Sequence, residues 1–147
     1  MSEEQVAGIR SRFTICSTLE EAVKDADLVI EAIVERKDIK SMVFRQVDAL
    51  VRPDTIIATN SSRMVSSMFK DEISHPERLA NLHYFNPALV MKLVEVVKGE
   101  HCSAEAAQAL YDFAASTGKT PILLKKEIDS FVANRILHAI NDEARWL

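Results

Sequence analysis

The sequence contains very little glycine, with only Gly8, Gly99 and Gly118 among its 147 residues. None of the three stands in a GxGxxG motif, the glycine-rich loop with which many α/β domains hold phosphate groups. Glycine and proline are also too few for a collagen-like or low-complexity chain. The composition therefore excludes a glycine-loop phosphate site within these residues, and it favours a folded globular chain.

Cysteine and long apolar runs are scarce as well. Cys16 and Cys102 lack the close spacing of metal ligands or redox pairs, so we expect buried, unpaired thiols, no metal site and a reducing compartment. No apolar run approaches the length of a membrane span, and residues 1–5 are acidic and polar where a secretory signal would be basic and then apolar. The sequence predicts a cytoplasmic protein with no membrane partner.

The charge gives no footprint for nucleic acid. The net charge is -4, and basic runs such as Lys125-Lys126 are only pairs, which excludes nucleic acid as the default partner. Hydrophobic residues make up 48% and charged residues 27% of the chain, ordinary values for a globular protein. A chain of this length is sufficient for one domain with a sizeable core.

Short apolar runs alternate with amphipathic segments, a pattern typical of an α/β protein with a largely parallel sheet. Residues 27–33 have a nearly continuous apolar centre, which predicts a strand covered on both faces. Capping-box patterns at Ser2 and Thr18 predict two short helices. The expected strands are 13–16, 27–33, 55–59, 79–85, 91–97 and 121–124, and the other expected helices lie at 39–50, around 64–68, at 104–117 and from 131 onward.

The polar turn Asn60-Ser61-Ser62 follows the strand at 55–59. In open parallel sheets, ligands bind outside the carboxyl ends of the strands, so Asn60 and Ser62 lie where a binding site is usually placed. The alternative is a polar residue that only caps the next helix, and the spacing leaves it open.

The strands at 79–85 and 91–97 are too close for a helical crossover, so they can pair only as an antiparallel hairpin. In a hairpin centred near Leu89, His83 falls directly opposite Glu95. A carboxylate bonded to one imidazole nitrogen fixes the tautomer and makes the other nitrogen more basic, so the pair indicates a general base. The alternative is a solvated pair at a sheet edge, although Glu95 interrupts an apolar run and a buried carboxylate needs a partner.

The segment HYFNPALVMKLVEVV at 83–97 resembles the histidine segment of the 3-hydroxyacyl-CoA dehydrogenases. Four further stretches resemble motifs of that family, namely DLVIEAIVE at 27–35, ATNSS at 58–62, GKTP at 118–121 and FVANR at 131–135. The resemblance covers essentially the whole chain. It implies NAD as cofactor, an acyl-CoA substrate, a typically homodimeric protein, and oxidation of a (3S)-hydroxyacyl-CoA to 3-oxoacyl-CoA in fatty acid or butyrate metabolism, including β-oxidation.

The same resemblance implies roles for four residues in catalysis. His83 would take the proton of the 3-hydroxyl, and Glu95 would orient and polarise His83. Ser62 would hydrogen-bond the substrate hydroxyl, and Asn134 would lie near the thioester and the catalytic histidine.

Three further residues, Glu35, Lys40 and Asn60, match family positions that contact the nicotinamide end of NAD. For Asn60 this favours a binding role over a helix cap. Lys40 retains an alternative, because a lone lysine on a helix is usually solvated.

Two departures from the family pattern bear on what these residues can do. Asp129 and Ser130 stand where the family usually has Pro-Gly. The family also begins with a strand, a GxGxxG loop and a helix, so we expect an incomplete Rossmann-type NAD-binding domain at 1–127 that lacks its first βαβ unit and binds NAD weakly. Residues 128–147 would begin a C-terminal helical dimerisation and substrate domain, and Trp146 and Leu147 end the chain in mid-pattern, as expected of a sequence truncated at both ends.

Three functional hypotheses follow. The first is a 3-hydroxyacyl-CoA dehydrogenase of which this sequence is a part. The second is a noncatalytic remnant or assembly partner that does not bind NAD. The third is a related dehydrogenase of a free hydroxy acid or of carnitine.

Overall fold

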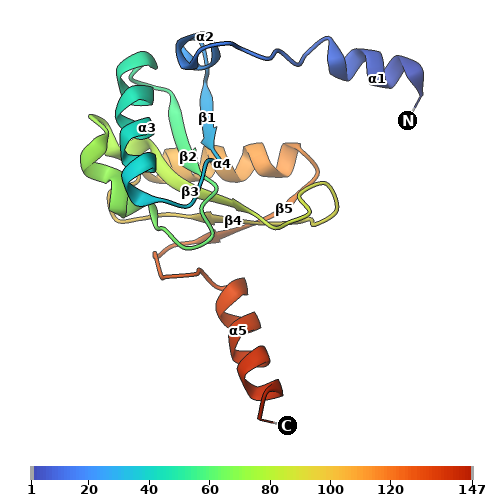
Figure 1. The fold of residues 1–147 in the computed structure, drawn as a ribbon, viewed down its shortest axis with the longest axis vertical. Coiled ribbons are helices and arrows are strands. Elements are labelled where there is room, and N and C mark those ends of the chain that lie inside the picture. Colours follow the sequence, from blue (N-terminus) through green and yellow to red (C-terminus); the bar gives the residue numbers. More distant parts are fainter. Residues whose placement is uncertain (1, 147) are drawn as a thin grey trace.

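A computed structural model describes residues 2–146, and its centre is one open five-stranded sheet (Figure 1). The strands lie in the order of the chain, with β1, β2 and β3 parallel, β3 and β4 antiparallel, and β4 and β5 parallel. This confirms the expected α/β class with a largely parallel sheet. The strands are β1 (Leu28–Glu31), β2 (Ile56–Thr59), β3 (Leu79–Tyr84), β4 (Leu93–Val97) and β5 (Thr120–Leu124).

The helices follow the expected order with small shifts at their ends. The predicted short helix near Met64 is a 3-10 helix that begins two residues later, at Ser66. The last helix begins at Ala133 rather than Phe131. The helices are α1 (Glu3–Arg10), α2 (Leu19–Val23), α3 (Lys37–Leu50), η1 (Ser66–Glu72), η2 (Pro76–Arg78), α4 (Ala104–Ser116) and α5 (Ala133–Ala144).

Side-chain capping defines two of the early helix starts. Ser2 and Gln5 form the full capping box predicted for α1, each side chain bonding to the other residue's backbone N–H. Thr18 caps α2 by accepting from the N–H of Glu21, but the Glu21 carboxylate accepts from Ser17 rather than closing the box at Thr18. The second box is therefore only half formed.

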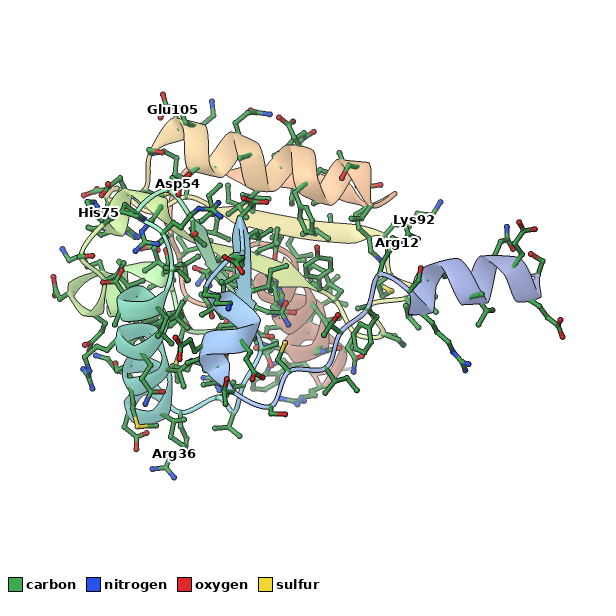
Figure 2. All side chains as sticks on the ribbon, turned by 90° about the horizontal axis from the view of Figure 1, so that it is seen from above. Arg12, Arg36, Asp54, His75, Lys92 and Glu105 are labelled. Carbon is green, nitrogen blue, oxygen red and sulfur yellow. The ribbon has the colours of Figure 1, made fainter. Side chains whose placement is uncertain are left out.

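The sheet is covered on both faces by different helices, because successive strand residues point to opposite sides. Ala80 and Leu82 face α4 and share one buried cluster with its Leu110. Ile57 and Leu79 face the other way, into a second cluster with α3 and η1. Figure 2 shows this arrangement from above, with Glu105 on α4 and Arg36 before α3 at opposite sides of the molecule.

Two expectations for the N-terminal edge of the sheet are wrong. Residues 13–16 form no strand, and Phe13 and Ile15 are 71% and 84% exposed. The strand predicted at 27–33 is shorter and is not covered on both faces, since Ile30 is 38% exposed. The cause is that α4 packs against β3, β4 and β5 and leaves the outer face of β1 open.

Helix α5 extends away from the sheet (Figure 1). None of its residues is buried, and Ile136, Leu137 and Ile140 are exposed. Trp146 is exposed too, while Leu147 lies outside the described residues. Whether a separate helical domain begins at residue 128 stays a prediction. Within residues 2–146, no helix combines the length and hydropathy that a membrane span requires.

The two cysteines differ in burial. Cys102 is buried, as expected, and this burial raises the pKa of its thiol to about 11. Cys16 is only half-buried, because the segment around it packs against no neighbouring strand. Both are free thiols, and within residues 2–146 no group of His, Cys, Asp or Glu side chains has metal-site geometry.

Candidate active site

The carboxyl ends of β1, β2 and β3 lie side by side at one end of the sheet, where the antiparallel strand β4 begins; this end is called the carboxyl edge. Glu31, Thr59, His83 and Glu95 lie at this edge on β1, β2, β3 and β4. All four are buried, although they are polar. Buried polar side chains require partners, so their contacts define the site.

His83 and Glu95 form the hairpin pair that the sequence predicts. They are register partners across β3 and β4, and His83 Nδ1 lies 2.9 Å from Glu95 Oε2. Their side chains are 3% and 0% exposed, so the alternative of a solvated pair is wrong. Because a carboxylate only accepts hydrogen bonds, Nδ1–H donates and Nε2 is left with its lone pair.

The second oxygen of Glu95 is also occupied. Glu95 Oε1 accepts from the backbone N–H groups of Val132 at 3.1 Å and Ala133 at 2.9 Å, at the start of α5. Hydrogen bonds to both oxygens offset the cost of burying the carboxylate. The sequence gives no local signal for this contact, which spans 37 residues.

Nε2 of His83 faces the polar turn after β2, where Ser62 Oγ lies 3.2 Å away. Ser62 is exposed while His83 is buried, so the hydroxyl stands between the imidazole and solvent. The imidazole also contacts the rings of Phe85 and Phe131, at centroid distances of 4.5 and 5.3 Å. His83, Glu95 and Ser62 are therefore brought together as a chain of groups that ends at an accessible hydroxyl.

Lys40 is buried in an ion-pair network, so the alternative of a solvated lysine is wrong. Its side chain is 1% exposed, and Nζ lies 2.6 Å from Glu31 Oε1. Glu31 also accepts from Thr59 Oγ1 at 2.7 Å and from the N–H of Ile33 at 2.6 Å. This network fixes the carboxyl ends of β1 and β2 relative to α3.

Glu35 is the accessible member of this network. Lys40 Nζ lies 3.3 Å from Glu35 Oε2, and Ser61 Oγ donates to the same carboxylate. Partial burial raises the pKa of Glu35, but the Ser61 hydrogen bond and the charge of Lys40 together lower it below its usual value. Glu35 is therefore held as an anion at the sheet edge.

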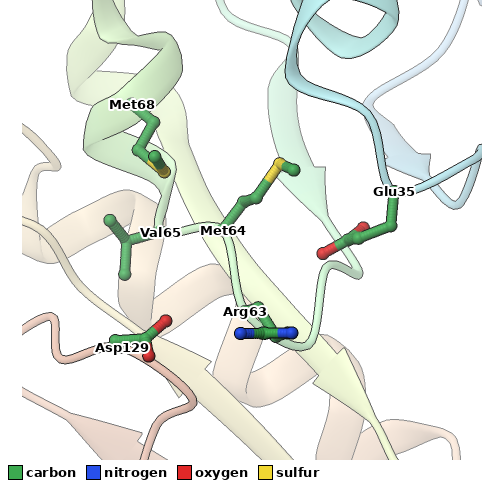
Figure 3. Close-up of a pocket in the computed structure, with 6 residues that line it drawn as sticks. All are labelled: Glu35, Arg63, Met64, Val65, Met68 and Asp129. Carbon is green, nitrogen blue, oxygen red and sulfur yellow. The ribbon is translucent and has the colours of Figure 1, made fainter.

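A pocket of about 440 Å³ opens beside Glu35 (Figure 3). Its wall is mostly apolar, and charged groups stand around it. Figure 3 shows the Arg63 guanidinium between the carboxylates of Glu35 and Asp129. The lining residues are Glu35, Arg63, Met64, Val65, Met68 and Asp129.

The two predicted asparagines are placed differently. Asn60 Oδ1 accepts from the N–H of Tyr84 at 2.8 Å, and the Asn60 N–H donates to Glu31 O, so this residue ties the ends of three strands together. Asn134 is half-buried in the first turn of α5, next to Ala133. In the described part of the chain it forms no hydrogen bond with His83, and its predicted contact with substrate stays a prediction.

Three polar residues that hold this edge together were not identified from the sequence as site residues. They are Glu31, Thr59 and Ser61, and all are buried. Glu31 carried a usable signal, since it is an acid inside an apolar strand with a lysine nine residues later. Thr59 and Ser61 carried none, because their partners lie on other elements.

The residues present fit the nicotinamide-ribose end of a dinucleotide only in part. The half-exposed Glu35 carboxylate beside a pocket suits a ribose hydroxyl. Lys40 is too buried to touch a cofactor and acts through Glu35, and Asn60 has one amide atom already engaged. The sequence carries no GxGxxG motif, so these residues provide no glycine-rich loop to bind the pyrophosphate.

The largely parallel α/β sheet, with a His–Glu pair and the Glu35 carboxylate at the carboxyl ends of its strands, has the architecture of a Rossmann-type domain with its ligand site in the usual place. The profile of the 3-hydroxyacyl-CoA dehydrogenase, NAD binding domain, matches residues 1–128. The chain belongs to this family of NAD-dependent oxidoreductases.

Individual relatives agree with this assignment. The chain is 38% identical over 136 residues to an L-carnitine dehydrogenase from Pseudomonas sp, covering 92% of this chain and 42% of that protein. Among solved structures, 3-hydroxybutyryl-CoA dehydrogenase from Escherichia coli K12 is 37% identical with a TM-score of 0.93, covering 98% of this chain and 30% of that one. The (S)-3-hydroxybutyryl-CoA dehydrogenase from Ralstonia eutropha is 33% identical with a TM-score of 0.93, covering 98% and 50%. The chain thus spans half or less of the length of these proteins.

Proposed function

We propose that this chain carries the proton-transfer site of an NAD-dependent oxidation of the 3-hydroxyl of a (3S)-hydroxyacyl-CoA to the 3-oxoacyl-CoA. The reaction would be carried out by a longer protein of which these residues form a part. The single observation that supports this most strongly is the alignment of Glu95, His83 and Ser62, with Nδ1 on the carboxylate and Nε2 on an accessible hydroxyl.

The proton path follows from the hydrogen-bond roles. The Ser62 hydroxyl would donate to or accept from the substrate 3-hydroxyl and hold it near His83 Nε2. Nε2 would take the hydroxyl proton as the carbon–oxygen double bond forms, and the new imidazolium would be stabilised by Glu95. NAD, when bound, supplies the acceptor for the hydride that leaves the same carbon.

Glu95 would keep its orientation throughout, because both of its oxygens already accept hydrogen bonds. Its role would be to keep the proton on Nδ1 and to balance the charge that develops on His83. Asn134 would approach the thioester from the first turn of α5. These roles rest on geometry and on the family resemblance together.

On the cofactor side, Glu35 would bind a ribose hydroxyl, with Lys40 and Ser61 holding its carboxylate in place. Asn60 would contribute through the half of its amide that does not bind Tyr84. We expect the 147-residue chain alone to bind NAD weakly, because a pyrophosphate would find no glycine-rich loop on it.

A second candidate is oxidation of a free 3-hydroxy acid or of carnitine, and Arg63 favours it. This exposed arginine follows Ser62 directly, lines the pocket, and forms no ion pair within residues 2–146. A guanidinium binds a carboxylate in a bidentate manner, and a free acid has that carboxylate where a thioester has none. Carnitine adds a quaternary ammonium, for which Asp129 would provide the opposite charge.

The proposal is tested with the complete reading frame that contains these residues, by following NADH consumption with acetoacetyl-CoA. We expect turnover that His83→Ala lowers by about 100- to 10,000-fold, the range typical of a lost general base. We expect no detectable turnover from the 147-residue chain alone. A complete frame that is inactive on hydroxyacyl-CoA, hydroxy acids and carnitine would favour the noncatalytic assembly role. A cytoplasmic location and a homodimer stay predictions.

A further inference from the structure

The short segment 130–133, here called the α5 anchor, is where the last helix joins the end of the sheet that carries His83 and Glu95. We infer that the α5 anchor is a positioning element for His83, acting through Glu95 and through the ring of Phe131, so that displacement of α5 would release the imidazole from its orientation toward Ser62. The consequence for catalysis rests on the proposed function. The positioning itself does not, because it can be measured without turnover.

The first line of support is the way Glu95 is shared. One oxygen binds His83 and the other accepts from the N–H groups of Val132 and Ala133. Val132 is the N-cap of α5, and its side chain forms no capping hydrogen bond. The Glu95 carboxylate instead accepts from the N–H groups at the start of the helix and so caps it. If the two amides move away, Oε1 loses its partners in a fully buried site, and the carboxylate must move or recruit water.

The second line of support is local backbone strain. Ser130 and Phe131 have φ angles of 60° and 53°, in the left-handed region that side chains other than glycine rarely adopt. A residue in this conformation is strained and persists only where surrounding contacts compensate. The contacts of Phe131 provide this compensation, because the backbone conformation buries Phe131 completely and holds its ring 5.3 Å from the His83 ring.

The third line of support is how little else attaches α5. None of its residues is buried, and its apolar side chains Ile136, Leu137 and Ile140 are exposed. Within residues 2–146, the hydrogen bond from Ala133 to Glu95 is the one that joins the helix to another element. A force on α5 is therefore transmitted to the sheet through the α5 anchor and reaches the catalytic carboxylate directly.

The competing explanation is that Glu95 simply caps α5 and that Phe131 simply fills space. The two differ in what happens to His83. If the anchor only supports the fold, loosening it changes stability and leaves the imidazole tautomer and its contact with Ser62 as they are. If the anchor positions His83, the imidazole signature changes while β3 and β4 stay intact.

The test uses the full 147-residue chain and compares Phe131→Ala with Phe85→Ala. Both rings touch His83, but only Phe131 belongs to the anchor. Ring nitrogen NMR reports the His83 tautomer, and amide hydrogen exchange reports the N–H groups of Val132 and Ala133. Leu82 and Val96, register partners in β3 and β4, report whether the sheet remains folded.

For Phe131→Ala we expect loss of the single Nδ1–H tautomer and exchange of the two anchor amides at least about tenfold faster, with Leu82 and Val96 still protected. For Phe85→Ala we expect the tautomer and the anchor amides to be retained. The inference is overturned if Phe131→Ala leaves the tautomer unchanged, or if Phe85→Ala disturbs the anchor amides equally.

A measurement on the unmodified chain keeps the inference testable if Phe131→Ala does not fold. Scalar coupling across a hydrogen bond links an amide nitrogen to the carboxylate carbon that accepts its proton. We expect such coupling from Val132 or Ala133 to the side-chain carboxylate of Glu95, and its absence from both would overturn the inference. Failure of the proposed function would instead be seen as absence of turnover with these signals intact.

Discussion

Glu95 and His83 face each other across the antiparallel pair of β3 and β4, with Oε2 and Nδ1 2.9 Å apart and both side chains buried. The relationship places the imidazole at the carboxyl edge of the sheet with Nε2 directed at Ser62. It also joins two distant parts of the chain, because Glu95 binds the start of α5 as well. A single carboxylate thus fixes the tautomer of His83 with one oxygen and binds the start of α5 with the other.

Substituting Glu95→Gln separates these two roles. The glutamine oxygen can still accept from Val132 and Ala133, but its NH2 group must donate to Nδ1, which moves the imidazole proton to Nε2. We expect anchor amides that remain protected, a reversed His83 tautomer, and turnover of the complete enzyme reduced by about 100-fold or more. Glu95→Ala serves as the comparison, since it should lose both the tautomer and the amide protection. A Gln variant with the original tautomer would contradict this reasoning.

The buried ion pair of Lys40 and Glu31 is expected to matter for stability. Lys40→Met leaves Glu31 as an uncompensated buried charge and should lower the free energy of unfolding by about 3–5 kcal/mol, measured by urea denaturation. The double variant Glu31→Gln with Lys40→Met removes that charge and should recover much of the loss. Arg36→Met, which breaks an exposed pair with Asp38, is the control and should have little effect. If Lys40→Met lowers the free energy of unfolding as little as Arg36→Met does, the buried network does not contribute to stability as argued.

The left-handed backbone at Ser130 leads to a stabilising substitution. Ser130→Gly should raise the free energy of unfolding by about 0.5–1 kcal/mol, because glycine removes the steric cost at φ 60° and loses only part of that gain to its flexible unfolded state. The converse control is Gly118→Ala, where φ is 76° in open space, and there we expect a loss of about 1 kcal/mol. Thermal unfolding of both variants checks the sign, and a destabilised Ser130→Gly would refute the strain argument.

Arg63 distinguishes the two candidate substrate classes. If the substrate is a free acid, Arg63→Leu should raise the KM for 3-hydroxybutyrate or carnitine by at least about tenfold. The KM for the acyl-CoA substrate should change little, because only the free acid has a carboxylate that the guanidinium can bind at this position. Arg10→Leu on α1 is the control for a general loss of positive charge. Steady-state kinetics of the complete enzyme provide the comparison. Equal effects on both classes would rule out a role in choosing between them.

The main features of the fold could be predicted because they rest on local pattern. Apolar runs alternating with amphipathic segments indicate the α/β class, and the short connection around Leu89 makes the hairpin obligatory and sets His83 opposite Glu95. The strand expected at 13–16 failed because an apolar, β-branched segment still needs a partner strand, and β1 pairs only with β2 in the described residues. Local strand propensity does not show whether a partner strand is present.

The site was less predictable where contacts are distant in sequence. The sequence around Lys40 is that of a solvated helix residue, because its ion-pair partner Glu31 lies on another element, β1. The hydrogen bond between Glu95 and the start of α5 has no sequence signature. Ser130 stands where the resemblance to the family implies a glycine, and its positive φ gives the physical reason for that preference. The residues that bear chemistry were recognisable, while those that hold them in place were not.

The most direct test of the central claim is the protonation pattern of the His83 ring in the folded chain. His75, His101 and His138 are replaced by Gln so that one imidazole remains, and its two ring nitrogens are observed by nitrogen NMR at mildly alkaline pH. The account predicts a single neutral tautomer with the proton on Nδ1 and a free lone pair on Nε2 facing Ser62. A proton on Nε2, or two averaged nitrogen signals, would contradict a general base held in place by Glu95.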